Sequence, residues 1–288
     1  VGSEMCIRDS LEAAGEARGR LCVGIDPHPY LLEKWGLEPT ADGLRSFSMR
    51  CVEAFSDIAA LVKPQVAFFE RFGSRGFAVL EEVLAALRDA ECLTLADAKR
   101  GDIGSTMAGY ADAWLDEQSS LRADSVTVSP YLGVGALGPV FTKAEETGRG
   151  IFVLAATSNP EARAIQSVPV GEQGTIAQAV VDECAAYNVS AHKAGVPGNV
   201  GVVVGATLDN PPCLDALNGP VLLPGVGAQG AGPEQVHNIV SKCPSLGFAN
   251  VSRAVLEQGP SVADLRKSVV RMAEAVSYTH LTLPTICR

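Results

Sequence analysis

Short apolar segments alternate along this chain with longer segments in which apolar residues recur every three or four positions. Short runs bounded by Gly or Pro are typical of buried strands, and the longer pattern is typical of helices that cover a sheet. The short runs predict eight strands, at residues 21–25, 61–68, 93–96, 125–129, 151–155, 201–204, 221–223 and 248–251.

The segments between these strands predict helices. They lie near residues 43–59, 76–89, 105–117, 138–147, 174–187, 233–241 and 262–275. A helix is least expected between the sixth and seventh strands, where the connection is short and rich in Pro. Eight strand–helix repeats favour a closed (β/α)8 barrel, a single-domain TIM barrel, over an open doubly wound sheet. The length of 288 residues suits that fold.

The two ends of the chain encode complementary DNA. Residues 5–9, Met-Cys-Ile-Arg-Asp, can be encoded by ATG TGT ATA AGA GAC, whose reverse complement encodes Val-Ser-Tyr-Thr-His, the residues at 276–280. Both ends resemble a translated transposon adapter. We therefore expect residues 1–10 and 276–288 to be non-native, adapter-derived ends and residues 11–275 to form the barrel. A shortened first helix would weaken the barrel floor without touching the chemistry.

Nearly every predicted strand ends in a polar or charged residue. The active sites of such barrels lie where the carboxyl ends of the strands open into loops, so these side chains are expected to face one mouth. In strand order they are Asp26, Lys63, Asp97 with Lys99, Ser129, Thr157 with Ser158, residues 205–207, Gln229 and Arg253.

Asp97 and Lys99 stand two positions apart at the end of the third strand. The alternation of a strand places both on one side and turns Ala98 outward. Lys63 on the neighbouring strand can point into the same mouth, and Asp102 follows at the start of the next helix. Such a network can fix an anion and deliver a proton from Lys99 to a developing carbanion. It predicts decarboxylation of a phosphorylated, anionic small molecule.

A phosphate site is expected beside this network. The Gly-rich residues 225–232 follow the seventh strand, where backbone N–H groups can turn toward one anion. Arg253, after the eighth strand, supplies a guanidinium that can bind phosphate through two hydrogen bonds.

Composition limits the partners and the location. The net charge of −10 speaks against a nucleic-acid partner, and apolar runs are shorter than the roughly 20 residues of a membrane span. The eight cysteines are scattered without metal-ligand spacing, which suggests free thiols in a reducing cytosol; with no secretory signal seen, we expect a cytoplasmic protein.

Seven runs, taken together, resemble the orotidine 5′-monophosphate decarboxylase family, specifically its longer bacterial branch. The resemblance implies decarboxylation of orotidine 5′-monophosphate to UMP and CO2 in de novo pyrimidine synthesis, with neither metal nor organic cofactor. The runs are Leu-Cys-Val-Gly-Ile-Asp-Pro-His-Pro (21–29), Val-Lys-Pro-Gln-Val-Ala-Phe-Phe-Glu (62–70), Asp-Ala-Lys-Arg-Gly-Asp-Ile-Gly-Ser-Thr (97–106), Val-Ser-Pro-Tyr-Leu-Gly (128–133), Thr-Ser-Asn-Pro (157–160), Gly-Val-Gly-Ala-Gln-Gly (225–230) and Ser-Arg (252–253).

The resemblance also implies a role for each matching residue. Lys99 would protonate C6 of the pyrimidine, and Asp97 would lie beside the leaving carboxylate. The remaining assignments are Asp26 and Lys63 to the ribose and the charge network, Ser158 to the pyrimidine amide, and Gln229 with Arg253 to the phosphate. Asp102, Ile103 and Thr106 would reach into a neighbouring subunit's site, which implies a homodimer with shared active sites.

Two alternatives stay open. One is a Mg²⁺-dependent sugar-phosphate decarboxylase or synthase of the same barrel group, which shares the Asp97, Lys99 and Asp102 pattern but needs extra carboxylate ligands. The other is a non-catalytic barrel that only binds phosphate. We interpret His28, flanked by prolines, as a structural residue near the first strand end.

Overall fold

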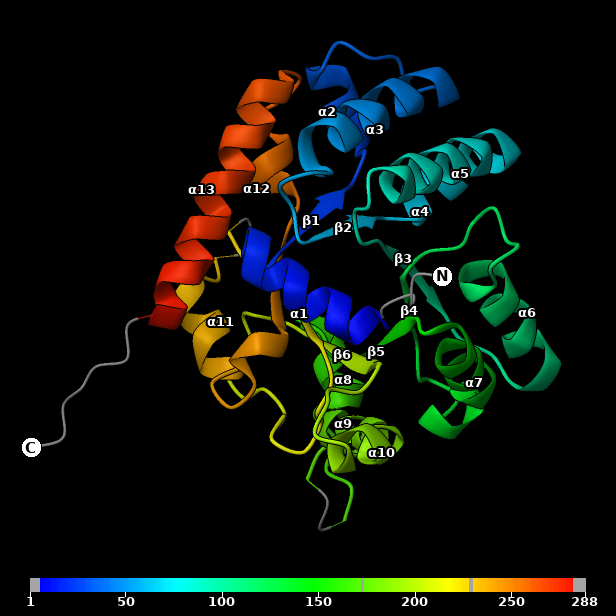
Figure 1. Ribbon diagram of the computed structural model, residues 1–288, viewed down its shortest axis with the longest axis vertical. Coiled ribbons are helices and arrows are strands. Elements are labelled where there is room, and N and C mark those ends of the chain that lie inside the picture. The colour runs from blue at the N-terminus through cyan, green and yellow to red at the C-terminus, as the bar shows by residue number, and fades with distance from the viewer. Residues whose placement is uncertain (1–5, 172–173, 228–229, 282–288) are drawn as a thin grey trace, which may run out of the picture.

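The computed structural model describes residues 6–171, 174–227 and 230–281, and it shows a (β/α)8 barrel (Figure 1). Eight parallel strands follow the order β2-β1-β8-β7-β6-β5-β4-β3, and the isolated bridges Val62↔Thr94 and Gln65↔Asp97 join β2 to β3 and close the ring. The predicted fold class is confirmed. The strands are β1 (Leu21–Ile25), β2 (Leu61–Pro64), β3 (Leu95–Arg100), β4 (Ser125–Val128), β5 (Gly150–Ala156), β6 (Val200–Val204), β7 (Val221–Pro224) and β8 (Gly247–Val251).

Long helices surround this ring, and shorter ones lie in the loops. The long helices are α1 (Ile7–Arg18), α3 (Ala41–Phe55), α5 (Gly73–Asp89), α6 (Gly104–Leu115), α7 (Gly138–Thr147), α9 (Ile176–Tyr187), α11 (Pro233–Ile239) and α13 (Val262–Leu281). The short ones are α2 (Pro29–Lys34), α4 (Ala67–Glu70), α8 (Arg163–Gln166), α10 (Val189–Lys193), α12 (Arg253–Leu256) and the 3-10 turns Val134–Leu137, Pro160–Ala162 and Pro244–Leu246. None of the helices described is long and apolar enough to cross a membrane.

Two predicted strands differ from the structure by more than one residue at an end. The second strand ends at Pro64 instead of residue 68, because the apolar residues that follow form α4 and bury Phe69 as a helix does. The third strand starts later than predicted, at Leu95, and continues through the charged residues to Arg100. Between β6 and β7, residues 205–220 are described throughout and form no helix, as the Pro-rich connection suggested.

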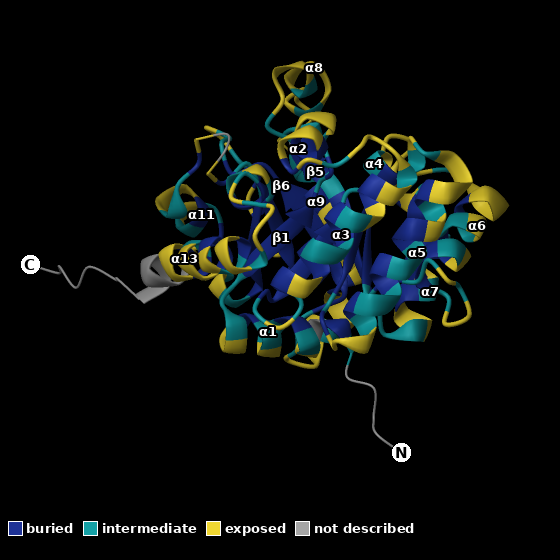
Figure 2. Ribbon diagram, turned by 90° about the horizontal axis from the view of Figure 1, so that it is seen from above, coloured by how far each residue is buried: buried dark blue, intermediate teal, exposed yellow. Residues whose placement is uncertain are grey.

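Apolar side chains fill both sides of the ring. One large cluster lies between the strands and the surrounding helices, and a smaller one fills the inside of the barrel. Figure 2 shows the buried residues in the centre, with α1 and α8 at opposite ends of the barrel. Burial of this area is the main stabilising contribution to such a fold.

Helix α1 closes the floor of the barrel, at the amino ends of the strands. Its Leu11 is only 1% exposed and belongs to the inner cluster together with Ile7, Phe152 and Phe248. The Ile7 N–H donates to Gly148 O over 2.8 Å, which fixes the start of the helix below β5. The floor is therefore sealed by side chains, and the opposite end stays open for a site.

Candidate active site

A cavity of about 460 Å³ opens at the carboxyl ends of the strands. Its walls combine an apolar base with polar and charged groups from most strands of the ring. The residues that line it are Asp26, His28, Lys63, Gln65, Asp97, Lys99, Thr127, Leu154, Thr157, Val203, Leu222, Pro224, Gly225, Val226, Asn250, Ser252 and Arg253. Six of the predicted strand-end residues line this mouth, namely Asp26, Lys63, Asp97, Lys99, Thr157 and Arg253, whereas Ser129, Ser158 and residues 205–207 are not part of its lining.

Asp97 lies at the centre of this cavity and accepts hydrogen bonds on both oxygens. Lys63 Nζ lies 2.9 Å and Gln65 Nε2 2.7 Å from Oδ2. Lys99 Nζ lies 2.6 Å from Oδ1, and the Thr127 hydroxyl donates to the same oxygen over 2.8 Å. Two ammonium groups and two neutral donors therefore hold one carboxylate in place.

The charges in this network stabilise one another. Burial by itself would raise the pKa of Asp97, but the charges of Lys63 and Lys99 outweigh it and hold that pKa well below its usual value. Burial likewise opposes the charge of Lys63, and the carboxylates of Asp97 and Asp26 overcome it and raise the Lys63 pKa above its usual value. Both residues are therefore charged at neutral pH.

Lys99 owes its position to an irregular backbone. Its φ of +50° lies in the left-handed region, where the pairing of β3 with β4 shifts register between Ala96 and Arg100. The Lys99 N–H donates to Thr127 Oγ1 over 2.9 Å. Asp97 and Lys99 do share one side, as predicted, but a bulge with a left-handed residue places them there, and regular strand alternation does not.

Arg100 holds the other side of this bulge. It donates to Ala98 O over 3.0 Å and forms an ion pair with Glu70 of α4. Its guanidinium also lies 5.6 Å from the ring of Tyr110 and 5.7 Å from that of Trp114, both on α6. The bulge is thus tied to the helices on both of its flanks.

Asp26 presents an unpaired acceptor to the cavity. Its Oδ1 lies 3.9 Å from Lys63 Nζ, is buried, and accepts no hydrogen bond from the residues that the structure describes. Two positions earlier, a Cβ on Gly24 would lie 1.9 Å from Ser252 Oγ, so only glycine lets β1 approach the β8 loop this closely. A carboxylate oxygen that accepts no hydrogen bond is suited to accept one from a ligand hydroxyl.

Arg253 and the loop after β7 form the part of the cavity wall next to β1. Arg253 lines the cavity with Gly225 and Val226, and Gly225 and Gly227 have φ values of +104° and +76°. Such a backbone can turn N–H groups toward an anion. Gln229, the other residue predicted to bind phosphate, lies outside the described residues.

Two further predictions concern residues at the edge of the cavity. Thr157 lines it, and Ser158 follows directly, with its backbone packed against Gly205 at the end of β6. Asp102, Ile103 and Thr106 do not belong to the cavity lining described for this chain; Ile103 is 61% exposed. The roles assigned to these residues stay predictions.

Sequence reasoning missed several residues of this site. Gln65 and Thr127 hold Asp97 directly, and Asn250 and Ser252 line the cavity near Arg253. Thr127 lies two residues before the predicted strand end, so only the register of β4 against β3 could have revealed it. His28 also lines the cavity, with its ring 4.4 Å from that of Phe68. Burial, the largest effect, lowers the pKa of His28.

Most of the ionisable and amide side chains that line the cavity carry nitrogen, and only two of them, Asp26 and Asp97, are carboxylates. Among the residues described, no group of three or more His, Cys, Asp or Glu side chains could hold a metal ion. Positive charge in the cavity comes from Lys63, Lys99 and Arg253.

Known proteins resemble this chain over most of its length. The model of the orotidine 5′-phosphate decarboxylase / HUMPS family matches residues 19–268. The orotidine 5′-phosphate decarboxylase of Corynebacterium efficiens is 60% identical over 268 residues, 92% of this chain and 95% of that protein. The enzyme of the same name from Corynebacterium glutamicum is 56% identical over 269 residues, 93% of this chain and 97% of that protein.

Solved structures agree with these relatives. A Streptomyces avermitilis structure, provisionally named an orotidine 5′-phosphate decarboxylase, superposes with a TM-score of 0.91 and 45% identity, covering 98% of both chains. The OMP decarboxylase of Leishmania donovani superposes with a TM-score of 0.78 and 29% identity, covering 96% of this chain and 100% of that one.

Proposed function

This chain belongs to the orotidine 5′-phosphate decarboxylase / HUMPS family, and we propose that it is a carboxy-lyase that converts orotidine 5′-monophosphate to UMP and CO2 in pyrimidine biosynthesis. The observation that carries this proposal is the set of four donors around Asp97, with Lys99 reaching into the cavity. Following the loss of orotidine 5′-monophosphate absorbance with the purified protein tests it.

The reaction breaks the bond between C6 and the carboxylate and leaves its electron pair on C6. We assign Lys99 to deliver a proton to that carbon as CO2 departs, since its side chain is 44% exposed and its ammonium is held 2.6 Å from Asp97 Oδ1. A fixed ammonium stabilises the charge that develops in the transition state. Asp97 stays ionised beside the leaving carboxylate. The buried Lys63 holds the Asp97 carboxylate in place through its hydrogen bond to Oδ2.

The rest of the cavity is suited to the remaining parts of a nucleotide. The unpaired Oδ1 of Asp26 is an acceptor for a ribose hydroxyl. Arg253 and the glycine-rich loop after β7 are suited to the phosphate, together with Gln229. Ser158, beside Thr157 at the end of β5, is proposed to read the pyrimidine amide.

We propose that the enzyme needs neither a metal nor an organic cofactor. The lysines supply the positive charge that a Mg²⁺-dependent sugar-phosphate enzyme would take from its ion. Turnover of orotidine 5′-monophosphate that persists in excess EDTA supports this choice. Strict dependence on added Mg²⁺, or turnover of a keto-sugar phosphate instead, would favour the rival enzyme.

We also propose a homodimer in which each subunit completes the other's site. Exposed apolar side chains gather on two neighbouring loops: Ile103 after β3, and Tyr131 and Leu132 after β4, which are 80% and 54% exposed. The loops lie side by side, since the Ser129 N–H donates to Arg100 O over 2.8 Å. Exposed apolar groups of this kind mark association surfaces, and Asp102 directly precedes Ile103 and accepts its N–H over 2.8 Å.

Mixing two inactive variants tests this arrangement. An Asp102→Ala subunit paired with a Lys63→Ala subunit forms one intact site and one doubly defective site. Random exchange should therefore restore activity at about a quarter of the sites. No recovery, despite subunit exchange shown by differently tagged chains, would contradict shared sites while leaving the decarboxylase proposal standing.

A cytoplasmic location is part of the proposal. The seven described cysteines are all free, and four of them, Cys22, Cys51, Cys92 and Cys184, are buried. Burial raises the pKa of the Cys92 and Cys184 thiols to about 12. Such thiols are unreactive and suit a reducing compartment.

A further inference from the structure

We propose that the floor of the barrel carries a second anion site, which binds a phosphate-class oxyanion between Arg88, Arg122 and Arg149. These residues line a cavity of about 440 Å³ with Leu93, Glu117, Asp124, Thr147 and Gly148, and with Ile7 and Ser10 of the end that we expect to be non-native. It lies at the amino ends of β3, β4 and β5, the opposite end of the barrel from the decarboxylase cavity. All three arginines fall within the family match at residues 19–268.

Three separate segments bring the guanidinium groups together. Arg88 is in the last turn of α5, Arg122 is in the loop before β4, and Arg149 directly precedes β5. The positions are fixed, because Arg149 Nη1 donates to Leu115 O over 2.7 Å and Arg122 Nη1 to Ser119 O over 3.3 Å. The cluster is thus a feature of the folded barrel and does not depend on one helix end.

Among the residues that the structure describes, no carboxylate forms an ion pair with Arg88. Glu117 is engaged by the other two arginines, with Oε1 2.8 Å from Arg149 Nη1 and Oε2 4.0 Å from Arg122 Nε. Asp124 Oδ2 accepts from both the N–H and the hydroxyl of Thr94, over 2.8 and 2.7 Å. Three positive and two negative side chains therefore line the cavity, within a protein whose net charge is −10.

Two buried N–H groups of the cluster lack partners. Arg88 Nη1 and Arg149 Nε are buried and donate to none of the residues that the structure describes. Burial, and then the nearby charge of Arg122, lower the pKa of Arg88; the charges of Asp89 and Asp124 offset part of this shift, and Arg149 adds a smaller lowering effect. A buried N–H group without an acceptor is costly, and an anion between the arginines would supply one.

The chemistry of the cluster defines the ligand class. Planar guanidinium groups bind oxyanions with several equivalent oxygens through paired hydrogen bonds, and phosphate is the common case. The cavity is larger than one phosphate requires, so pyrophosphate and small phosphate esters belong to the same class. Its location on the floor lets it be occupied while the catalytic cavity holds nucleotide.

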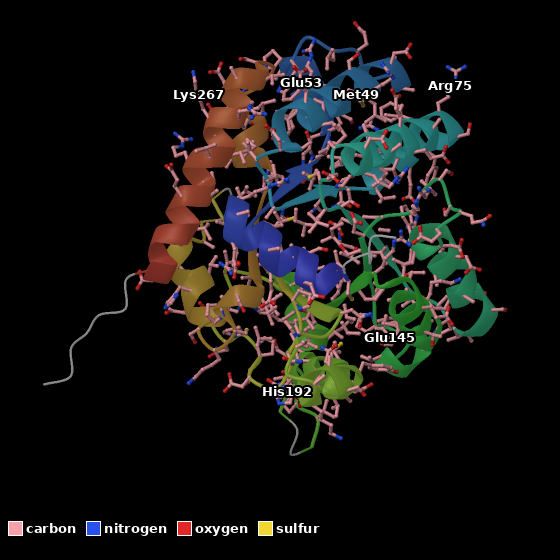
Figure 3. All side chains as sticks on the ribbon, viewed as in Figure 1. Met49, Glu53, Arg75, Glu145, His192 and Lys267 are labelled. Carbon is pink, nitrogen blue, oxygen red and sulfur yellow. The ribbon has the colours of Figure 1, made fainter. Side chains whose placement is uncertain are left out.

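Calorimetric titration with inorganic phosphate, pyrophosphate and ribose 5-phosphate tests the site and separates free phosphate from an ester. The background is Arg253→Ala, which weakens the catalytic phosphate site equally in every variant. Arg88→Met is compared with Arg75→Met, because Arg75 is an exposed residue of the same helix (Figure 3). We expect Arg88→Met to bind at least one of these anions at least about tenfold more weakly than Arg75→Met does. Equal affinities in the two variants would overturn the proposal.

Thermal unfolding provides a second readout, and Arg122→Met a second variant. Without phosphate, Arg88→Met should unfold at the same temperature as the Arg75→Met control or higher, since it removes repulsion and an unpaired donor. The best-binding anion should raise the unfolding temperature of the control and not that of Arg88→Met or Arg122→Met. If Arg88→Met unfolds earlier without the anion and all variants gain equally from it, the arginines are structural and the site does not exist.

Discussion

The hydroxyl of Thr127 on β4 donates to Asp97 Oδ1 on β3 over 2.8 Å. The same oxygen of Thr127 accepts the Lys99 N–H over 2.9 Å. One buried hydroxyl therefore fixes both the central carboxylate and the backbone of the residue proposed as the proton donor. Thr127 makes no proton transfer in this arrangement; it positions the two groups that do the chemistry.

Thr127→Val tests that positioning role. The variant keeps the shape of the side chain but removes both hydrogen bonds, so Asp97 and the Lys99 backbone lose a common anchor. We expect kcat to fall roughly ten- to hundredfold with KM within about twofold of the unchanged value. Steady-state kinetics with orotidine 5′-monophosphate give both constants.

Thr127→Ser is the matched control, because it keeps the hydroxyl and removes only the methyl group. It should recover most of the lost kcat. If Val and Ser variants lose kcat equally, packing of the methyl group matters and the hydrogen bonds do not.

Lys99→Ala separates a decarboxylase from a barrel that only binds phosphate. Loss of the proposed proton donor should lower kcat by at least about 10³-fold, while UMP still binds through Arg253 and the β7 loop. Calorimetry with UMP measures the binding. Lys267→Ala, on the exposed face of α13, is the control for loss of one surface lysine (Figure 3). Unchanged turnover in Lys99→Ala would remove Lys99 from the mechanism.

The ionisation of Asp97 makes part of the protein's stability depend on pH. The pKa of Asp97 in the folded chain lies below the ordinary value of 3.8. Its charge therefore stabilises the folded chain at pH values above 3.8, and this contribution is lost as the pH falls toward the folded pKa. Asp97→Asn leaves Lys63 without its main partner and should cost about 3–5 kcal/mol at pH 7. Urea unfolding of both proteins between pH 7 and pH 3 should show this difference shrinking below about pH 4. A difference that grows in acid would contradict the assigned charge state.

Arg253→Ala tests the phosphate end. A guanidinium that binds phosphate in both the ground and transition states contributes mainly to affinity, so KM should rise at least about tenfold. Arg253→Lys keeps the charge without the paired hydrogen bonds, so its KM should lie between the KM of the unchanged protein and that of Arg253→Ala. Equal KM values for all three proteins would show that the phosphate lies elsewhere.

Leu11→Ala tests the barrel floor. The side chain is 1% exposed inside the inner cluster, so its loss leaves a cavity and should cost about 2–5 kcal/mol in the free energy of unfolding. Glu16→Ala, on the exposed side of the same helix, is the control. Because the floor is remote from the lysines, kcat of the folded variant should stay unchanged. If the fully folded Leu11→Ala variant has a lower kcat, packing of the floor affects the active site.

The sequence was sufficient for the barrel and for most of its charged centre. Strand ends in such a fold must meet at one mouth, so Lys63, Asp97 and Lys99 could be placed together from their positions alone. Gln65 and Thr127 could not, because their roles depend on which residues face each other across β2, β3 and β4. The end of β2 was misplaced for a related reason: a run of apolar residues has no clear period, and both a strand and the buried turn of α4 fit it.

The left-handed backbone at Lys99 destabilises the folded chain, and the proposed catalytic role of this side chain requires it. A non-glycine residue with a φ of +50° costs the folded state of the order of 1–3 kcal/mol, which glycine would largely avoid. Glycine at position 99 would relieve this cost, but it would also remove the ammonium that lies 2.6 Å from Asp97 Oδ1 and is proposed to donate the proton, so the resulting barrel should no longer catalyse. Any attempt to stabilise this enzyme therefore has to keep the lysine at position 99.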